Sequence, residues 1–422
     1  MRAQICHSNV KEGAFISLPS SKSLSHRALI TAALATGVSK IDDVAISKDI
    51  EATMRAMSAL GASFTVNGNT ITAKGAGSLL KSDGVVDCGE SGSTLRFLIP
   101  LFALLEKETV FTGHGKLMER PQSVYEELFE KQGLQFEKDG SFLKLKGPLH
   151  GGYFSLPGDV SSQFFSGLLF ALPLCKEDSV IEILAPFESS SYVNLTIEAL
   201  RKAGVQATLK DDILHIPGNQ TYHSFETTVE GDDSQMAFYA EMALIHQAEV
   251  EVGNVSHDSM QGDHIIIDFA CQSGAKVIET EKGYLFAGGH GKAITADLSN
   301  CPDLGPALFA LATQLEGTSV FTGCGRLRIK ESDRIACMEE ELRKLGCDIS
   351  SKGDRVTVKG KTELNRNVIL HGHNDHRIVM ALAVLASISD GCIIEDGQAV
   401  SKSYPHFFDD FRACGMECEC HD

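Results

Sequence analysis

The chain has 422 residues, 43% of them hydrophobic, and a formal net charge of −18. This length suggests two or three domains, and the acidity argues against nucleic-acid or anionic-membrane partners, which call for clustered Lys and Arg. No apolar stretch reaches the roughly 20 residues that span a bilayer, and residues 1–10 carry no apolar signal segment, so we expect a cytoplasmic protein.

In chain order, the first predicted elements are a strand over residues 15–18, a polar loop and an apolar helix over residues 28–34. The same pattern recurs at 85–88 and 95–105, 153–156 and 164–174, 227–230 and 236–245, 294–298 and 307–315, and 368–371 and 378–388. After each helix, a second strand and a polar helix lead to a glycine that suits the left-handed position beyond a helix end. Five of these glycines are followed by a short hairpin. The six glycines recur roughly 70 residues apart, at Gly61, Gly133, Gly204, Gly274, Gly346 and Gly415. The sequence therefore predicts an α/β (α+β) fold of six βαβαββ units.

The ends of the chain indicate how these units are grouped. The sixth unit stops just after Gly415, before a hairpin could form, whereas residues 2–18 contain two strand-like stretches ahead of the first unit. We infer that the N-terminal strands complete the last unit and that three units pool their apolar faces in each domain. The predicted domain I contains residues 1–18 and 226–422, and domain II contains residues 19–225, with crossings near Pro19 and Phe225.

Twelve cysteines are present, and nine of them are scattered without the spacing of a metal site or a disulfide framework. We interpret these as reduced, small apolar side chains. Only Cys414, Cys418, Cys420 and His421 lie close together, and a frayed C-terminal tail is favoured over a metal site there.

Polar loops precede the six apolar helices, and the residues in these loops differ from copy to copy. The loops lie at residues 20–27, 89–94, 161–163, 231–234, 300–303 and 373–377. Ser, Asp, Asn and Gly at such positions are ordinary N-caps, and that interpretation covers most of each loop. It does not account for Lys22, Arg27 or Arg377, because cations are disfavoured at a helix N-terminus unless an anion lies between them.

The starts of the other helices carry further cations, namely Arg120, Lys330, Arg334 and Lys402. A solvated helix start would explain any one of these residues taken singly. Together the seven cations could offset the roughly −6 charge of two ligands that each bear a phosphate and a carboxylate. His26 and His376 lie in the same loops, where structural hydrogen bonding is at least as good an interpretation as catalysis.

The ordered motifs of these loops resemble those of the 5-enolpyruvylshikimate-3-phosphate (EPSP) synthase family, nearly from end to end. The motifs that carry the resemblance lie at residues 18–27, 89–96, 118–121, 161–163, 302–303, 329–334, 374–377 and 402–405. The resemblance implies two domains of three βαβαββ units each, with an active site in the cleft between them. It implies no metal or other cofactor, small-molecule substrates only, and a monomer.

The resemblance also implies how the site residues are shared between two substrates. For shikimate 3-phosphate it implies contacts from Lys22, Ser23, Arg27, Ser161, Ser162, Gln163, Ser189, Tyr192, Asp303 and Lys330. For phosphoenolpyruvate it implies Lys22, Gly92, Arg120, Gln163, Arg334, Arg377 and Lys402. Gly92 would be needed for close backbone approach, because a Cβ there would protrude into the site.

The implied reaction adds the 5-hydroxyl of shikimate 3-phosphate to C2 of phosphoenolpyruvate, protonates C3, and expels phosphate from a tetrahedral intermediate. Such a reaction needs a base near the hydroxyl, an acid near the methylene and cations on the departing phosphate. Asp303 is the candidate on the hydroxyl side, and Glu331, with Lys22 nearby, is the candidate for proton transfer at the methylene.

Two positions depart from the usual family pattern, Glu90 and Arg326, where many members carry Asn. They bear on local substrate contacts and inhibitor sensitivity.

Two other functions stay open. A UDP-N-acetylglucosamine enolpyruvyl transferase would share the architecture and the donor, although Ser23 follows Lys22 here where that family has Asn. A non-catalytic six-unit scaffold would use the loops only as helix caps.

Overall fold

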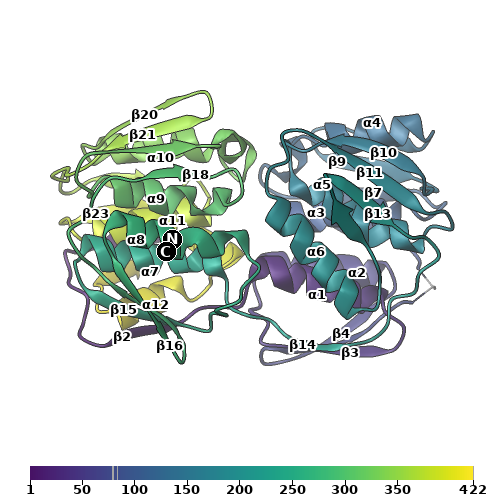
Figure 1. Ribbon diagram of the computed structural model, residues 1–422, viewed down its shortest axis with the longest axis horizontal. Coiled ribbons are helices and arrows are strands. Elements are labelled where there is room, and N and C mark those ends of the chain that lie inside the picture. Colours follow the sequence, from purple (N-terminus) through teal and green to yellow (C-terminus); the bar gives the residue numbers. More distant parts are fainter. Residues whose placement is uncertain (78–79, 83, 422) are drawn as a thin grey trace. The chain divides into compact units, whose positions relative to one another are not determined.

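The computed structural model describes residues 1–77, 80–82 and 84–421, and the chain divides into two compact units (Figure 1). Unit 1 is formed by Met1–Pro19 and Gly231–Asp422, and unit 2 by Ser20–Glu230. The chain therefore passes between the units after Pro19 and again after Glu230, whereas the sequence placed the second crossing near Phe225.

Within the described residues, each unit contains three four-stranded sheets with one shared topology. The two strands at one end of each sheet run parallel, and the remaining pairs are antiparallel. In unit 2 the sheets are β14(Glu226–Thr228)-β3(Val38–Asp42)-β5(Thr70–Lys74)-β4(Ser63–Asn67), β6(Val85–Asp87)-β7(Thr109–Thr112)-β9(Phe142–Lys146)-β8(Gln135–Lys138), and β10(Tyr153–Pro157)-β11(Ser179–Leu184)-β13(Ile213–Ile216)-β12(Thr208–Lys210). In unit 1 they are β16(Lys276–Thr280)-β17(Gly283–Ala287)-β15(Glu249–Gly253)-β2(Ala14–Ser17), β18(Thr295–Asp297)-β19(Thr318–Thr322)-β21(Arg355–Lys359)-β20(Asp348–Lys352), and β22(Ile369–His371)-β23(Cys392–Glu395)-β1(Arg2–Ile5)-β24(Cys418–His421).

Two helices accompany each sheet. The six apolar helices are almost wholly buried: α1(Lys22–Leu34), α3(Gly92–Phe102), α5(Ser162–Ala171), α7(Asp233–Ile245), α9(Gly305–Ala312) and α11(His376–Ala386). The six polar helices are α2(Lys48–Ala59), α4(Ser123–Lys131), α6(Ser190–Lys202), α8(Ile266–Ser273), α10(Arg334–Lys344) and α12(Phe407–Ala413). Short 3₁₀ turns are η1(Leu117–Glu119), η2(Leu172–Leu174), η3(Gly262–Ile265), η4(Pro302–Leu304), η5(Gly325–Ile329) and η6(Gly397–Lys402). The prediction of six βαβαββ units is confirmed, and all six repeat glycines have positive φ.

The two crossings exchange the first strands of two units. Strand β14 precedes α7 in the sequence, yet it pairs in parallel with β3, with Glu226 opposite Lys40, and so belongs to unit 2. Strand β2 precedes α1, yet it pairs in parallel with β15 of unit 1. Each strand thus stays in one unit while the helix that follows it begins the other. Residues 226–230 were for this reason wrongly assigned to domain I by sequence.

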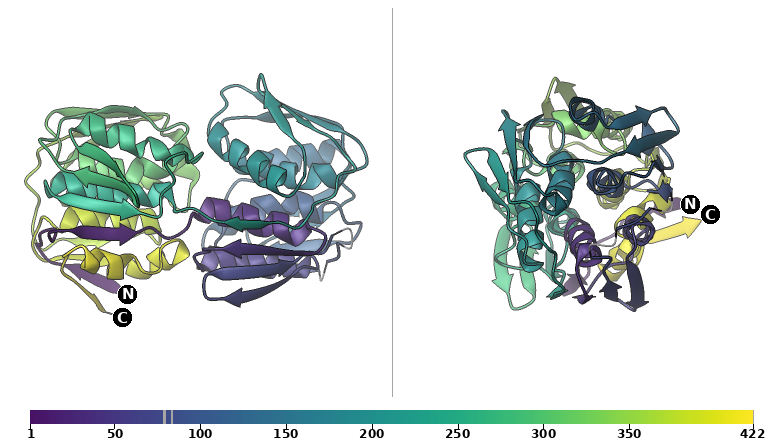
Figure 2. Two further views of the ribbon diagram at one scale, coloured as in Figure 1. Left: turned by 60° about the horizontal axis from the view of Figure 1, so that its bottom comes forward. Right: turned by 90° about the vertical axis from the view of Figure 1, so that its right-hand side faces the viewer.

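Of the two N-terminal strands that were predicted to complete the last unit, β1 does so, whereas β2 completes the sheet of β15. Strand β1 lies between β23 and β24 and is antiparallel to both, so the two ends of the chain lie side by side (Figure 2). The prediction of a frayed tail is wrong, because β24 is a paired strand and Cys414 and Cys418 are buried.

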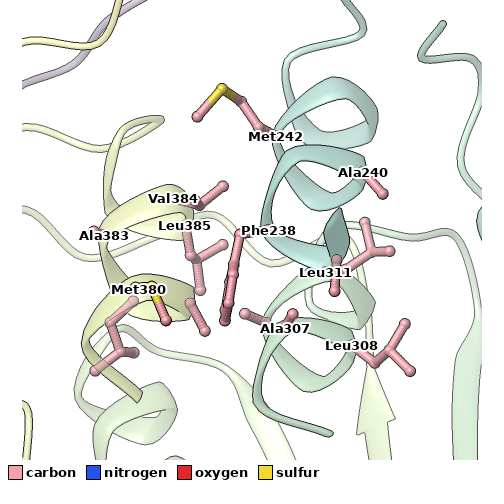
Figure 3. Packing of buried hydrophobic residues seen from close by; sticks show 14 of the residues in the cluster. Phe238, Ala240, Met242, Ala307, Leu308, Leu311, Met380, Ala383, Val384 and Leu385 are labelled. Atoms are coloured by element: carbon pink, nitrogen blue, oxygen red, sulfur yellow. The ribbon is translucent and has the colours of Figure 1, made fainter. Parts of the chain in front are cut away.

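The apolar helices build the cores. In unit 1, α7, α9 and α11 lie between the sheet that contains β20 and β21 and the sheet that contains β2 and β15 (Figure 1). Phe238 of α7 points between the side chains of α11 and α9 (Figure 3). In unit 2, α1, α3 and α5 contribute to two adjoining clusters. No helix within the described residues is long and apolar enough to cross a membrane.

Candidate active-site residues

The residues expected in loops belong to the first turns of the apolar helices. Lys22, Gly92 and His376 are the first residues of α1, α3 and α11, so these helices begin earlier than the sequence predicted. The residue before the first turn caps the helix in five copies, and its side chain accepts a backbone N–H two or three residues later. These caps are Ser21, Ser91, Ser161, Asp232 and Asp375.

In unit 2, Arg27 is buried one turn into α1 and is held by oxygen atoms of neutral groups. Its Nε donates to Thr196 Oγ1 at 2.8 Å, and its two terminal nitrogens donate to the carbonyls of Ser23 and Tyr192 at 2.7 and 2.8 Å. The guanidinium also lies 5.2 Å from the centre of the Phe97 ring. Burial lowers the pKa of Arg27 to about 10, so the site favours an anion that would restore its charge balance.

Lys22 lies at the first position of α1 and is partly buried. Its Nζ is 3.2 Å from Oδ2 of Asp49, which belongs to the first turn of α2. Asp49 is 7% exposed, and the pairing fixes the direction of the lysine side chain. Nothing in the sequence singled out Asp49 beyond its place near a helix start.

Gly92 begins α3 at a point where other side chains crowd the backbone. A Cβ built on Gly92 would lie 2.6 Å from Nη1 of Arg120 and 3.8 Å from Oε1 of Gln163. The glycine therefore lets the helix N-terminus approach the guanidinium. Gln163 in turn accepts from Arg96 Nη1 at 2.9 Å and donates to Ser93 Oγ at 3.0 Å, which joins the starts of α3 and α5. Gly92, Arg120 and Gln163, all of which are expected to contact phosphoenolpyruvate, thus lie together.

The serines assigned to shikimate 3-phosphate lie at two further helix starts of unit 2. Ser161 caps α5 and Ser162 is its first residue, and both are buried. Ser189 precedes α6, is fully buried and has a left-handed backbone with φ of 55°. Tyr192 lies in the first turn of α6, and its ring centre is 5.9 Å from the Arg27 guanidinium carbon. Ser189 and Tyr192 therefore belong with Arg27 rather than with the Gly92 group.

In unit 1, Asp303 of η4 is surrounded by three cations. Its carboxylate lies 2.8 Å from Arg334 Nη1, 3.2 Å from Arg377 Nη2 and 3.4 Å from Lys330 Nζ. Arg377 also donates to Ser234 Oγ at 2.8 Å. The structure thus brings together four predicted residues that lie in two different βαβαββ repeats of unit 1.

Asp375 is the second carboxylate of this cluster and is fully buried. Arg334 Nε donates to its Oδ2 at 2.8 Å, Ser332 donates to the same oxygen at 3.1 Å, and the Arg377 amide donates to Oδ1 at 3.0 Å. Burial would raise the pKa of Asp375, but Arg334 outweighs it and the net direction is down. Burial would likewise lower the pKa of Arg334, and Asp375, Asp303 and Glu331 raise it instead.

Glu331 lies beside His376 and Lys402. Its Oε2 is 3.1 Å from His376 Nδ1 and 3.9 Å from Lys402 Nζ, and Lys402 donates to the Asn374 carbonyl at 2.6 Å. His376 is 1% exposed. The sequence could not choose between a structural and a catalytic role for His376, and the structure places it beside Glu331, the residue expected to transfer a proton. Glu331, Asp375 and His376 are close enough to hold a cation, and Arg334 and Lys402 already supply positive charge there.

The pKa of Lys330 is lowered by burial and by several neighbouring cations. Burial lowers the pKa of Lys330 to about 8, Asp303 opposes this shift, and Arg326, Arg334 and Arg377 add to it. The influence of Arg326 places this departure from the usual pattern within the cation group, where it is 7% exposed. Glu90, the other departure, lies against Gly115, whose added Cβ would be 2.8 Å from its Oε2.

Three participants carried no usable sequence signal. Arg96 and Asp375 lie within the motifs and Asp49 lies outside them, and the contacts of all three depend on partners far away in the sequence. Arg96, for example, also donates to the Pro121 carbonyl at 3.0 Å. Acids and cations at helix starts are common, and only the fold shows which of them meet.

The architecture is that of an enolpyruvyl transferase fold. The structure is similar to the enolpyruvyl transferase NikO from Streptomyces tendae, with a TM-score of 0.78, 12% identity and coverage of 99% of this chain and 98% of the other. It is also similar to EPSP synthase from Acinetobacter baumannii, with a TM-score of 0.81, 25% identity and coverage of 99% and 100%.

Sequence comparison gives the family itself. The family model of EPSP synthase (3-phosphoshikimate 1-carboxyvinyltransferase) matches residues 11–411. The 3-phosphoshikimate 1-carboxyvinyltransferase of Clostridium kluyveri is 42% identical over 410 residues, covering 96% of this chain and 95% of the relative. That of Clostridium beijerinckii is 40% identical over 412 residues, covering 95% and 94%. The chain belongs to the EPSP synthase family.

Proposed function

We propose that this chain is an enzyme that transfers the 1-carboxyvinyl group of phosphoenolpyruvate to the 5-hydroxyl of shikimate 3-phosphate. The products would be 5-enolpyruvylshikimate 3-phosphate and phosphate, in the shikimate pathway to chorismate and the aromatic amino acids. The observation that carries this proposal is the match of the family model over residues 11–411, with relatives named for that activity at about 40% identity over nearly the whole chain.

We assign the binding of shikimate 3-phosphate chiefly to the Arg27 group of unit 2. Arg27, Ser161, Ser162, Ser189 and Tyr192 offer a buried guanidinium, hydroxyls and an aromatic face, which suit a phosphate on a sugar-like ring. The full proposed set adds Lys22, Ser23, Gln163, Asp303 and Lys330.

We assign phosphoenolpyruvate to the Gly92 group of unit 2 and to three cations of unit 1. The α3 N-terminus offers backbone N–H groups and a positive helix end next to Arg120, a favourable arrangement for a phosphate. The complete proposed set is Lys22, Gly92, Arg120, Gln163, Arg334, Arg377 and Lys402.

Asp303 is the proposed base for the 5-hydroxyl. In the free protein, Arg334, Arg377 and Lys330 stabilise its carboxylate form. Phosphate and carboxylate groups of the substrates would compete for these cations, and that competition would free a carboxylate oxygen to accept the hydroxyl proton.

Glu331 is the proposed acid that protonates C3, with Lys22 contributing to proton transfer. Its contacts with His376 and Lys402 provide a route by which the proton can be replaced. Arginines at the departing phosphate would stabilise the negative charge that develops as the tetrahedral intermediate collapses. No step of this sequence calls for a metal.

The decisive experiment measures phosphate release from phosphoenolpyruvate with shikimate 3-phosphate or UDP-N-acetylglucosamine as acceptor. We expect release with shikimate 3-phosphate alone. Release only with the UDP-sugar would assign the chain to the other enolpyruvyl transferase, and release with neither acceptor would favour a non-catalytic scaffold.

We further propose a cytoplasmic location and a monomeric state. All twelve cysteines are free, as expected in a reducing compartment. Light scattering on the purified protein would test the monomer directly.

A further inference from the structure

Unit 2 contains a continuous chain of buried polar side chains that none of the assignments above uses. His26 Nδ1 of α1 lies 2.7 Å from Thr53 Oγ1 of α2, and Thr53 Oγ1 lies 2.7 Å from Thr94 Oγ1 of α3. Thr94 Oγ1 then donates to Ser91 Oγ at 2.7 Å. All four residues have no exposed surface. Three helices that are separate in sequence are thus joined by side-chain hydrogen bonds.

Both ends of this chain adjoin the proposed binding residues. His26 lies on α1 between Ser23 and Arg27, and Ser91 immediately precedes Gly92. Thr53 follows Asp49 by one helical turn on α2, so the same face of α2 that holds Lys22 also holds His26. The N-terminus of α3 is therefore tied to α1 through Thr53.

The hydrogen bonds have a preferred direction. Burial, with the nearby charges of Lys22 and Arg27, lowers the pKa of His26 well below its usual value, so the imidazole is neutral at pH 7. Its Nε2 has no hydrogen-bond partner among the described residues, whereas Nδ1 faces the Thr53 hydroxyl. When Nδ1 carries the proton, each hydroxyl donates to the next and the chain runs towards Ser91.

This direction leaves a donor at the N-terminus of α3. Ser91 Oγ accepts both the amide of Thr94, at 3.1 Å, and its hydroxyl, so the Ser91 hydrogen can be donated outward. An anion at the start of α3 is the natural acceptor for that hydrogen. The start of α1 has separate anchors, because Arg27 is bonded to Thr196 and to the Tyr192 carbonyl. Loss of the hydrogen bonds from His26 to Ser91 should therefore disturb the position of α3 more than that of α1.

We propose that Thr53 is a positioning residue that fixes the α3 N-terminus, with Ser91 and Gly92, for phosphoenolpyruvate. This inference rests on the proposed function. Thr53 touches neither substrate in this proposal and acts through Thr94 and Ser91.

The test compares Thr53→Val, which keeps the shape and removes the hydroxyl, with Thr53→Ser, which restores the hydroxyl. We expect Thr53→Val to raise the KM for phosphoenolpyruvate about tenfold, the effect of roughly one positioning hydrogen bond, and the KM for shikimate 3-phosphate less than about twofold. Thr53→Ser should restore the KM for phosphoenolpyruvate. Thr94→Val breaks the same link from the other side and should match Thr53→Val, which covers the case that one variant folds poorly.

Thr31→Val is the matched control. Thr31 is equally buried in unit 2, but its hydroxyl bonds to the carbonyls of Arg27 and Ala28 within its own helix. Thr31→Val should lower the melting temperature of the protein without changing the KM for either substrate. A second readout is the rise in melting temperature that phosphoenolpyruvate causes in the presence of shikimate 3-phosphate, which Thr53→Val should reduce.

The outcomes separate this inference from the proposed function. A wild-type protein without turnover would overturn both. Normal wild-type turnover with unchanged KM values in Thr53→Val would overturn the positioning role alone. Equal changes in both KM values, or a failure of Thr53→Ser to restore the KM for phosphoenolpyruvate, would show that this chain of hydrogen bonds serves stability only.

Discussion

The two units use the same βαβαββ frame but neutralise their buried cations in opposite ways. In unit 2, Arg27 donates to a hydroxyl and two carbonyls and lies over aromatic rings. In unit 1, Arg334 and Arg377 share the carboxylates of Asp303 and Asp375. The βαβαββ repeat sets where a cation is placed. Neighbouring elements within the same unit decide whether its partners are neutral groups or carboxylates.

This difference has an electrostatic consequence. With neutral partners, burial lowers the pKa of Arg27 to about 10, so an anionic ligand would gain by completing its charge balance. With carboxylate partners the pKa of Arg334 rises above its usual value, and a ligand there must compete with groups already bound. Unit 2 is thus suited to holding an anion, and unit 1 to exchanging charge and protons when one arrives.

Asp303→Asn should have the largest effect, because Asp303 is both the proposed base and the shared partner of three cations. The amide cannot accept the hydroxyl proton, so we expect kcat to fall about 10³-fold, within the range of general base catalysis. The measurement is phosphate release at saturating substrates.

Asp297→Asn provides the control for that variant. Asp297 ends β18 and accepts the Ser299 amide at 2.9 Å. It should keep its activity. If Asp303→Asn retained more than about a tenth of the wild-type kcat, a role as base would be excluded.

Arg27→Lys should have the next largest effect, and it tests the neutral-partner arrangement of unit 2. Lysine keeps the charge but cannot reach Thr196 Oγ1 and the Ser23 and Tyr192 carbonyls at once. We expect the KM for shikimate 3-phosphate to rise about 100-fold, equivalent to roughly two charge-assisted hydrogen bonds. Steady-state kinetics with varied shikimate 3-phosphate measures this.

Arg201→Lys is the matched exchange on an exposed helix position. Arg201 pairs with Glu198 on α6 at 2.7 Å and is 71% exposed, so its replacement should leave both KM values unchanged. An equally small effect of Arg27→Lys would contradict the assignment of Arg27 to substrate.

Glu241 shows how a buried ionisable group behaves when neither neutral hydrogen-bonding groups nor opposite charges in the described part of the chain pair with it. It lies in α7 of unit 1, is fully buried, and neither carboxyl oxygen has a hydrogen-bond partner among the described residues. Burial raises the pKa of Glu241 well above its usual value, so the folded protein keeps a proton that the unfolded chain releases above about pH 4.3. The free energy of unfolding should therefore fall as pH rises from that value towards the folded pKa.

Glu241→Gln removes this titration. We expect the variant to gain about 1–3 kcal/mol in unfolding free energy over the wild type at pH 7.5, and little at pH 4.5, as measured by urea denaturation. Glu316→Gln, an exposed acid paired with Lys361, should show no such pH-dependent gain. Equal stability of Glu241→Gln and wild type at both pH values would show that Glu241 is compensated in the folded state.

The repeated frame could be read from the sequence because its signals are local. Glycines after helices, such as Gly274 with φ of 104°, and caps such as Ser161 act within a few residues of themselves. The exchange of β2 and β14 could not be read, because each strand precedes its helix as in every other copy. Their partners, β15 and β3, are set only by long-range pairing.

In the candidate site, too, the local features could be predicted from the sequence and the long-range contacts could not. The cations at helix starts were predicted from the motifs, since a charge at a helix N-terminus is visible locally. Their partners were not, because Asp49 of α2 meets Lys22 of α1, and Asp375 before α11 meets Arg334 of α10, only after these helices pack together. The sequence therefore predicts the residues that bind anions better than it predicts the residues that hold them in place.

Lys330 gives the smallest expected effect and the sharpest test of the crowding in unit 1. Burial and neighbouring cations lower its pKa to about 8, while the unfolded chain titrates near 10.4. Between these values the folded state loses its proton first, so the unfolding free energy should rise with pH in that window. Substrate binding should change in the opposite sense, because a neutral Lys330 no longer attracts phosphate.

We expect the kcat/KM of the wild type for shikimate 3-phosphate to fall above pH 8, by about tenfold at pH 9, because that parameter reports ionisations of the free enzyme. Lys330→Arg stays charged throughout this range and should move the fall to higher pH. Lys361→Arg, an exposed lysine paired with Glu316, should leave the profile unchanged. A profile of Lys330→Arg that overlays the wild type would assign the ionisation to another group and would contradict the role of Lys330.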